Sequence, residues 1–454
     1  MDQSVIGAER GVFRNRAFLA LWGAQILSQV AANAITFALI VLVGELTKSN
    51  TSSSFLILLS IVPAVGLGIV AGVIVDRSVR KRVLVITNAL RAIAVLPLLF
   101  FGESVPTAYA VNFLVAAITT FFVPAESATI PAIVRKKDLL VANSLFTFTF
   151  NGAFLVGFII VAPILIAIAG YQVLFTIIAL MFAGAAILCL TVPDAIPASG
   201  PMSVGVAGEA VAETRRAVAE AFGYLRTAPA VLWALVYIAL TYMLIAVAGA
   251  LAPGFVREVL GLSEKNVVVL VAPAGLGVIA GLGVLNVIGG RIPRPRAIGI
   301  GLIVVGVALI VLAAARPFAG VFRTAAGGAM GEGFPFFVAV VSATAFVFGI
   351  AYAFITVPAM TMLQEDLRDD LRGRVFGVLN MLVSVFSFLP LVIVGPIADL
   401  YGVAPVFVAA AVAVAAAWLG GRATRRRPRH AVADASVDAS VDDQAPRDPR
   451  SSEL

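Results

Sequence analysis

The sequence has few of the residues on which most enzymes depend. One cysteine, Cys189, and one histidine, His430, occur among 454 residues, and only 13% of the chain is charged. A lone cysteine forms no internal disulfide, and neither a metal-ligand cluster nor a nucleophile-base cluster can be read from the chain. No GxxxxGK[ST] phosphate loop is present, so nothing indicates ATP hydrolysis. We therefore expect no enzymatic activity, no cofactor and no bound metal.

Apolar residues take the place of those groups. They make up 61% of the chain, and runs of about 20 residues recur, a length that spans a hydrocarbon core about 30 Å thick as a helix. Since backbone amides in lipid must be satisfied internally, the sequence predicts an all-α membrane protein. Twelve spans are predicted, at residues 17–46, 54–75, 83–101, 108–132, 141–168, 171–192, 230–252, 267–289, 297–315, 336–363, 375–398 and 404–420.

Basic residues set the predicted orientation. All but five of the 32 Lys and Arg fall in the termini, in the third span or in loops after even-numbered spans. The positive-inside rule then places both termini in the cytosol of a multi-pass protein of the cell (inner) membrane. The net charge of +7 reports this topology and does not indicate nucleic-acid binding.

An internal repeat divides the chain into two halves. "PAVGLGIVAG" from Pro63 recurs as "PAGLGVIAG" from Pro273, and "VPAE" at 123–126 recurs as "VPAM" at 357–360. Close Gly and Ala spacing also serves helix packing in any membrane protein, but two pairs in matching order favour a duplication. Two pseudo-symmetric six-helix bundles are typical of transporters.

The predicted organisation follows from these halves. A cytosolic N-terminus at 1–16 precedes a first bundle at 17–192, and a cytosolic linker at 193–229 carries an amphipathic helix. A second bundle at 230–420 leads to a cytosolic tail at 421–454, whose composition predicts disorder.

Several stretches resemble the major facilitator superfamily. Its signature loop is matched by Gly72, Asp76, Arg77, Arg80, Lys81 and Arg82, with Val79 where the family usually has glycine. "WGAQILSQVAANAITFAL", "FFVPAESATIPAIV" and "LRGRVFGVLNML" resemble the branch that contains macrolide-efflux and enterobactin-exporter-like proteins. The resemblance implies the twelve-helix fold and drug:proton antiport, although Ala32-Asn33 stands where that branch often has Gly-Asp.

The signature loop predicts a conformational latch. A carboxylate is stabilised by the positive end of a helix, and the helix that begins near Arg374 offers such an end to Asp76. If the two dock, they hold the halves together on the cytosolic side, in the outward-open state. The alternative is a solvated loop whose cations only set topology.

Two charges lie deep inside predicted spans. Arg91 and Glu126 are both roughly 12 to 13 Å from the cytosolic ends of their helices, so their depths match. Intramembrane charges are costly and are usually paired or functional. We expect an ion pair that is either structural or part of proton coupling.

Polar and aromatic residues define a candidate substrate cavity. Gln25, Gln29 and Asn33 form a stripe on the first span that either binds neighbouring helices or faces a wet cavity. The other candidates, on later spans, are Tyr237, Tyr242, Tyr352 and Asn380.

Because few charges lie near the midplane, we expect a neutral or amphipathic small molecule as cargo, and the resemblance implies that it is exported and is a drug, a macrolide or a siderophore-like compound. An importer or facilitator of a small neutral solute, and a non-transporting scaffold or sensor, remain alternatives. The expected partners are this small molecule and the lipid bilayer, and the chain is expected to act as a monomer.

Overall fold

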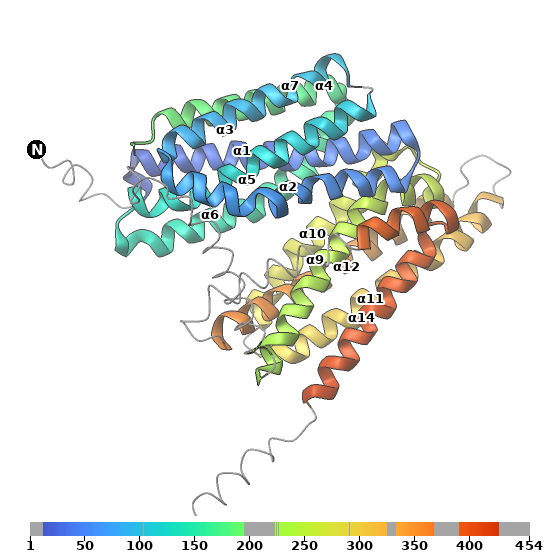
Figure 1. Ribbon diagram of the computed structural model, residues 1–454. Helices are drawn as coiled ribbons and strands as arrows, with labels where there is room; N and C mark the ends of the chain where they lie inside the picture. The colour runs from blue at the N-terminus through green and yellow to red at the C-terminus, as the bar shows by residue number, and fades with distance from the viewer. Residues whose placement is uncertain are drawn as a thin grey trace, which may run out of the picture.

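A computed structural model describes residues 12–102, 104–194, 223, 225, 227–289, 291–324, 333–366 and 390–425. Within these ranges the fold is all-helical, as predicted, and its helices fall into an N-terminal and a C-terminal half (Figure 1). Ten helical segments there are long and apolar enough to cross a membrane.

The N-terminal half holds the first six predicted spans. A 3₁₀ turn, η2 (Val12–Arg14), leads into α1, and Asn15 caps α1 by accepting hydrogen bonds from the amides of Ala17 and Phe18. Residues 139–190 form two helices that are separated at Gly170, whose φ of 79° and ψ of 176° are not helical, and the first of them contains a π-helix. The fifth and sixth predicted spans meet at this glycine. The elements are α1 (Arg16–Thr47), α2 (Asn50–Arg77), α3 (Arg80–Val95), α4 (Pro97–Phe100), α5 (Val105–Ile133), η3 (Lys136–Asp138), α6 (Leu139–Phe154), η4 (Leu155–Val161) and α7 (Ala162–Leu190).

The C-terminal half follows the same plan. Its described elements are α9 (Pro229–Phe255), η5 (Val256–Leu260), η6 (Glu264–Val267), α10 (Val268–Ile288), α11 (Arg294–Thr324), α12 (Gly333–Asp366), a helix at Pro390–Tyr401 and α14 (Val403–Arg425). The first part of the eleventh predicted span, 375–389, lies outside the described residues, as do most of the linker and the tail from residue 426.

The repeated prolines fall inside matching helices of the two halves. Pro63 lies in α2 and Pro273 in α10, while Pro124 lies in α5 and Pro358 in α12. These are the second and fourth long helices of each half, which fits a duplicated bundle.

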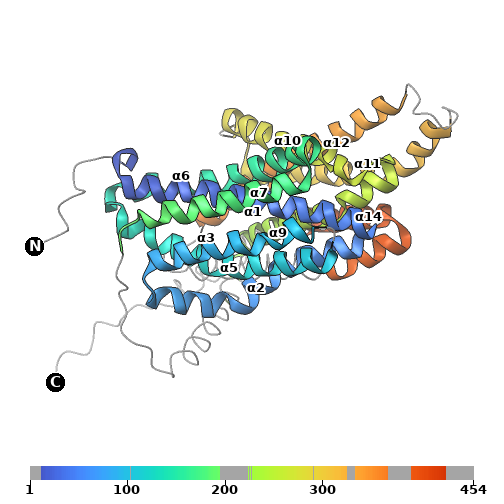
Figure 2. The same cartoon turned by 90° about the horizontal axis from the view of Figure 1, so that it is seen from above.

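The two halves lie at an angle to each other. They come together where α1 ends and α2 begins, which we call the joined end, and they diverge toward the opposite end, where α2 finishes and α3 begins (Figure 1). Seen from above, the helices of both halves run broadly along one direction (Figure 2). The positive-inside prediction would place the opposite end in the cytosol.

Candidate functional site

A cavity of about 320 Å³ lies between the two halves. Apolar and aromatic side chains from both halves line it, and among the residues that the structure describes the lining includes no charged one. Its side-chain hydroxyls come from Thr36 on α1 and Tyr352 on α12. The bulky apolar residues of the wall include Ile40, Ile57, Phe154, Phe158, Phe255, Leu270, Phe348 and Phe407.

Of the predicted cavity residues, Tyr352 lies in this lining. The polar stripe on α1 instead makes contacts within the N-terminal half: Gln25 Nε2 donates to the carbonyl of Phe146 on α6 at 3.2 Å, and Asn33 Nδ2 donates to the carbonyl of Gln29 at 2.8 Å. Gln25 and Gln29 are both buried. These contacts favour the interpretation that the stripe binds neighbouring helices over the interpretation that it faces a wet cavity.

The remaining predicted cavity residues lie elsewhere. Tyr237 is buried on α9 and lines a second hollow, toward the opposite end of the C-terminal half. Tyr242 is 40% exposed on the same helix and is not part of the cavity wall. Asn380 lies outside the described residues.

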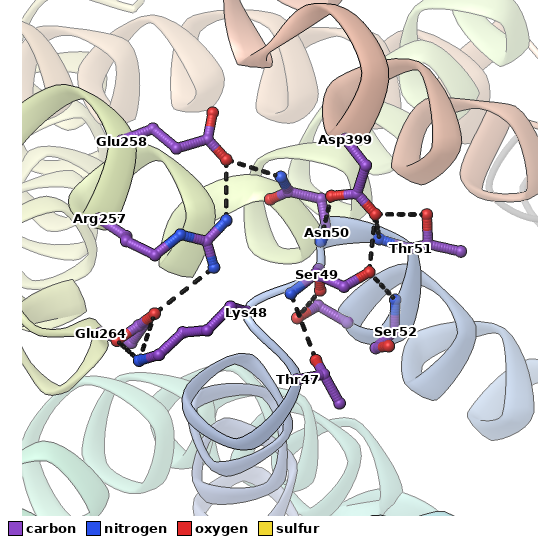
Figure 3. Close-up of polar contacts among 11 residues, drawn as sticks. Thr47, Lys48, Ser49, Asn50, Thr51, Ser52, Arg257, Glu258, Glu264 and Asp399 are labelled. Atoms are coloured by element: carbon purple, nitrogen blue, oxygen red, sulfur yellow. Dashed lines mark hydrogen bonds and ion pairs between the residues drawn. The ribbon is translucent and has the colours of Figure 1, made fainter.

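Asp399 joins the two halves at the joined end (Figure 3). It follows the predicted eleventh span directly, and its carboxylate sits on the first turn of α2. The backbone amides of Asn50 and Thr51 donate to it at 2.7 and 3.0 Å, and the hydroxyls of Ser49 and Thr51 donate at 2.6 Å each. An anion at a helix N-terminus satisfies free amides and complements the helix dipole. Partial burial raises the pKa of Asp399, but these hydrogen bonds lower it by more, so the net pKa is below the usual value.

A second chain of contacts runs beside Asp399 (Figure 3). Lys48 Nζ lies 2.8 Å from Oε2 of Glu264, whose side chain is only 2% exposed. Arg257 bridges Glu264 at 3.5 Å and Glu258 at 2.8 Å, and Asn50 Nδ2 donates to Glu258 at 3.0 Å. Lys48 and Asn50 belong to the N-terminal half and the other three residues to the C-terminal half. We call these five residues and Asp399 the seam.

Glycines allow the backbones to approach at the seam. A Cβ atom on Gly254 of α9 would overlap the side chain of Asn50, and a Cβ on Gly395 would lie 2.7 Å from the Cα of Thr51. Both positions must stay small for the halves to close at this end.

The signature loop lies at the opposite end. Arg80 donates to the carbonyl of Ala128 on α5 at 2.8 Å, and Lys81 lies 4.0 Å from Asp194, so these cations bind within the N-terminal half. Gly72 and Arg77 are half-buried in the last turns of α2, whereas Asp76 is exposed. Arg374, the predicted partner of Asp76, lies outside the described residues.

Arg91 and Glu126 lie inside the N-terminal half. They are 1% and 6% exposed on α3 and α5. The guanidinium of Arg91 donates to Asn88 Oδ1 at 2.8 Å and lies 4.3 Å from the ring centre of Phe122, and no direct ion pair joins it to Glu126. Glu126 Oε1 is buried without a hydrogen-bond partner among the described residues. Arg91 and Glu126 thus lie in the same interior, but they do not form the direct ion pair that we expected.

The seam was not predicted from the sequence. The sequence did carry a signal for it. Two short loops on the same predicted side of the membrane hold charges of both signs, at Lys48, Arg257, Glu258 and Glu264. Opposite charges in loops from different halves could have indicated an inter-half contact.

A helical membrane protein built from two bundles, with a cavity between them and a polar seam at one end, has the architecture of a secondary transporter. The family model described as Major Facilitator Superfamily matches residues 21–391. The chain therefore belongs to the major facilitator superfamily, and it is a transporter rather than an enzyme.

Known relatives agree with this assignment. Over 137 residues, 30% of this chain, it is 29% identical to the uncharacterized MFS-type transporter YkuC of Bacillus subtilis (strain 168). That match spans 32% of the relative's length. The resemblance to the efflux branch stays a prediction.

Solved structures share the fold. The nucleoside transporter NupG aligns with 91% of this chain and 100% of its own, at 13% identity and a TM-score of 0.67. A bacterial homologue of the human lysosomal transporter Spinster, in an inward-facing and unoccupied conformation, aligns with 90% of this chain and 97% of its own, at 15% identity and a TM-score of 0.65. At these identities the likeness shows the fold alone.

Proposed function

We propose that this transporter exports an uncharged apolar or amphipathic small molecule by alternating access. The observation that carries the proposal is the cavity between the halves, whose wall, as far as the chain is described, is apolar and aromatic and holds no charged residue. Cavities of this kind bind ligands mainly by burying apolar surface, and a few polar groups fix the orientation.

The absence of charge in the wall selects against ionic cargo. Moving an ion from water into an apolar site without a counter-charge costs several kcal/mol or more. Sugar phosphates and other polyanions would lose their hydration without compensation there. A neutral ring system would instead stack on Phe158 or Phe348, accept a hydrogen bond from Tyr352, or donate one to Thr36 Oγ1, whose own proton goes to the carbonyl of Ala32.

Alternating access requires that each end close in turn. The seam closes the joined end in the present state, and the described helices of the two halves diverge toward the opposite end. We propose that Asp76 closes the opposite end in the other state, by docking on the helix that begins near Arg374. Its exposure here fits a latch that is not engaged.

We assign the coupling proton to Glu126. A buried carboxylate inside a membrane span is a functional candidate by default, and Oε1 of Glu126 has no hydrogen-bond partner among the described residues. Glu126 does not line the cavity, so its protonation would act through the packing of α3, α5 and α7. Arg91 supplies the compensating charge in the same interior.

Proteoliposomes with an imposed pH difference test the coupling. Glu126→Gln keeps the shape of the side chain and removes the titratable group, so uphill export should stop while cargo binding persists. Glu365→Gln is the matched control, because Glu365 is exposed and pairs with Arg294 at the surface. Uphill export by the Glu126→Gln protein would show that Glu126 is structural. Downhill equilibration alone, in the unmodified protein, would identify a facilitator.

A further inference from the structure

A second hollow opens toward the opposite end of the C-terminal half, away from the cavity between the halves. Its volume is about 450 Å³, and α9, α11 and α14 form its wall. Two arginines, Arg296 at the start of α11 and Arg422 near the end of α14, line it together with Trp418.

Both arginines are exposed, and neither has an acidic partner among the residues that the structure describes. The guanidinium of Arg422 lies 4.5 Å from the ring centre of Trp418, which holds it over the hollow. The neighbouring Arg294 differs, because Glu365 already neutralises it. The described part of the wall thus carries two positive charges and no negative one.

Apolar side chains continue from the arginines along α11. Ile300 and Ile303 line the same hollow and are 47% and 50% exposed. Ile303 follows Arg296 by seven residues, which places it roughly 10 Å further along the helix. A cation near the helix end followed by exposed aliphatic groups matches the order of headgroup and acyl chain in a lipid.

The packing of α14 fixes this geometry. Gly420 and Gly421 face α9 so closely that a Cβ on either would overlap the ring of Trp233 or Tyr237. The end of α14 is therefore held against α9, with Arg422 beside the hollow rather than free in solution.

We propose that this hollow binds the phosphate group of an anionic phospholipid. Arg296 and Arg422 contact the phosphate, the indole N–H of Trp418 donates to the headgroup, and an acyl chain covers Ile300 and Ile303. Basic pockets between membrane helices recognise anionic headgroups by this combination of charge and depth. The proposal does not depend on the identity of the cargo or on the direction of transport.

Native mass spectrometry of the full-length protein tests the site. The protein is purified in detergent and titrated with phosphatidylglycerol or with phosphatidylcholine of the same acyl chains. The unmodified protein should retain phosphatidylglycerol preferentially. The double variant Arg296→Gln/Arg422→Gln should lose roughly 10- to 30-fold of that preference, the effect of two cations at a membrane surface.

Matched variants separate this site from general charge. Arg291→Gln removes an exposed cation at the same end that does not line the hollow, and it should leave the preference unchanged. Arg296→Lys/Arg422→Lys keeps the charge and should retain most of the preference, which would also show that the site tolerates substitution. An equal loss in Arg291→Gln, or no loss in the double Gln variant, overturns the proposal.

Inorganic phosphate distinguishes a lipid from a soluble anion. Millimolar phosphate should neither displace phosphatidylglycerol nor raise the melting temperature of the protein, because the acyl chain supplies part of the binding. If phosphate alone produces the full effect, the hollow is a soluble-anion site and the lipid proposal is wrong.

Discussion

Replacing Asp399 by Asn should open the joined end of the transporter. Asp399 accepts four hydrogen bonds from the first residues of α2, and two of them come from backbone amides that have no partner within the helix. Asparagine keeps one acceptor oxygen, loses the charge, and presents an NH₂ group to donors. The variant should fold normally, because the contact lies between the halves rather than within one.

The size of the effect follows from these contacts. An anion at a partly buried helix N-terminus is worth about 0.3–2 kcal/mol, and a hydrogen bond to a charged group about 1.5–3 kcal/mol. Because Asp399 is largely accessible to solvent, which screens its charge, we take the low part of this range, about 1–2 kcal/mol. The ratio of closed to open joined ends should fall by roughly 5- to 30-fold.

Cysteine accessibility measures this ratio. Ile57→Cys places a thiol in the cavity wall, roughly 10 Å along α2 from the seam, in a background where the buried Cys189 is replaced by Ala. A membrane-impermeant maleimide added from the joined end should react roughly tenfold faster when Asp399→Asn is present. Asp138→Asn is the matched control, because it removes a carboxylate at the opposite end of the N-terminal half, and it should leave the labelling rate unchanged. Equal labelling of the Asp399→Asn and control proteins would refute the role of the seam.

Three further predictions use the same reporter. Gly254→Ala should speed labelling from the joined end, because overpacking costs about 1–3 kcal/mol and the new methyl group meets Asn50; unchanged labelling would mean that the seam tolerates the volume. Asp76→Asn should slow labelling from the joined end by roughly two- to fivefold, because loss of the latch at the opposite end favours the state in which the joined end is closed. The labelling rate of the Asp76→Asn/Asp399→Asn double variant should fall between the rates of the two single variants. The pKa of Asp399 is lowered, so the stabilisation of the closed joined end by its carboxylate is present above the usual pKa of Asp and is lost only as pH falls through the lowered value. The labelling rate should therefore not vary between about pH 6 and pH 8. A change in rate with its midpoint in that window would assign closure to another group.

The helices could be predicted because hydropathy acts locally. Every predicted span that the structure describes coincides with a helix, and boundaries differ by a few residues at most of the ends. The largest difference is at α11, which continues to Thr324, past the predicted end at residue 315, because the helix runs on beyond Arg316, the charge at which the apolar run stops.

The site could be predicted only in part, because its contacts are not local. The stripe of Gln25 and Gln29 was visible at helical spacing, but spacing does not say which neighbour a helix face meets, and here Gln25 meets α6. Asp399 and Thr51 are 348 residues apart, so the cap on α2 depends on how the two halves pack. The depth match of Arg91 and Glu126 indicated a shared interior but not the aromatic rings that surround the guanidinium.

Transport of a neutral fluorescent hydrophobe into inverted membrane vesicles tests the central claim most directly. With an imposed pH difference, vesicles that contain the protein should accumulate the dye against its gradient. Ala248→Trp, which fills the cavity, should abolish accumulation, whereas Leu180→Trp on the exposed face of α7 should not. Accumulation only in right-side-out vesicles, or accumulation that survives Ala248→Trp, would contradict export of an uncharged cargo through the cavity between the halves.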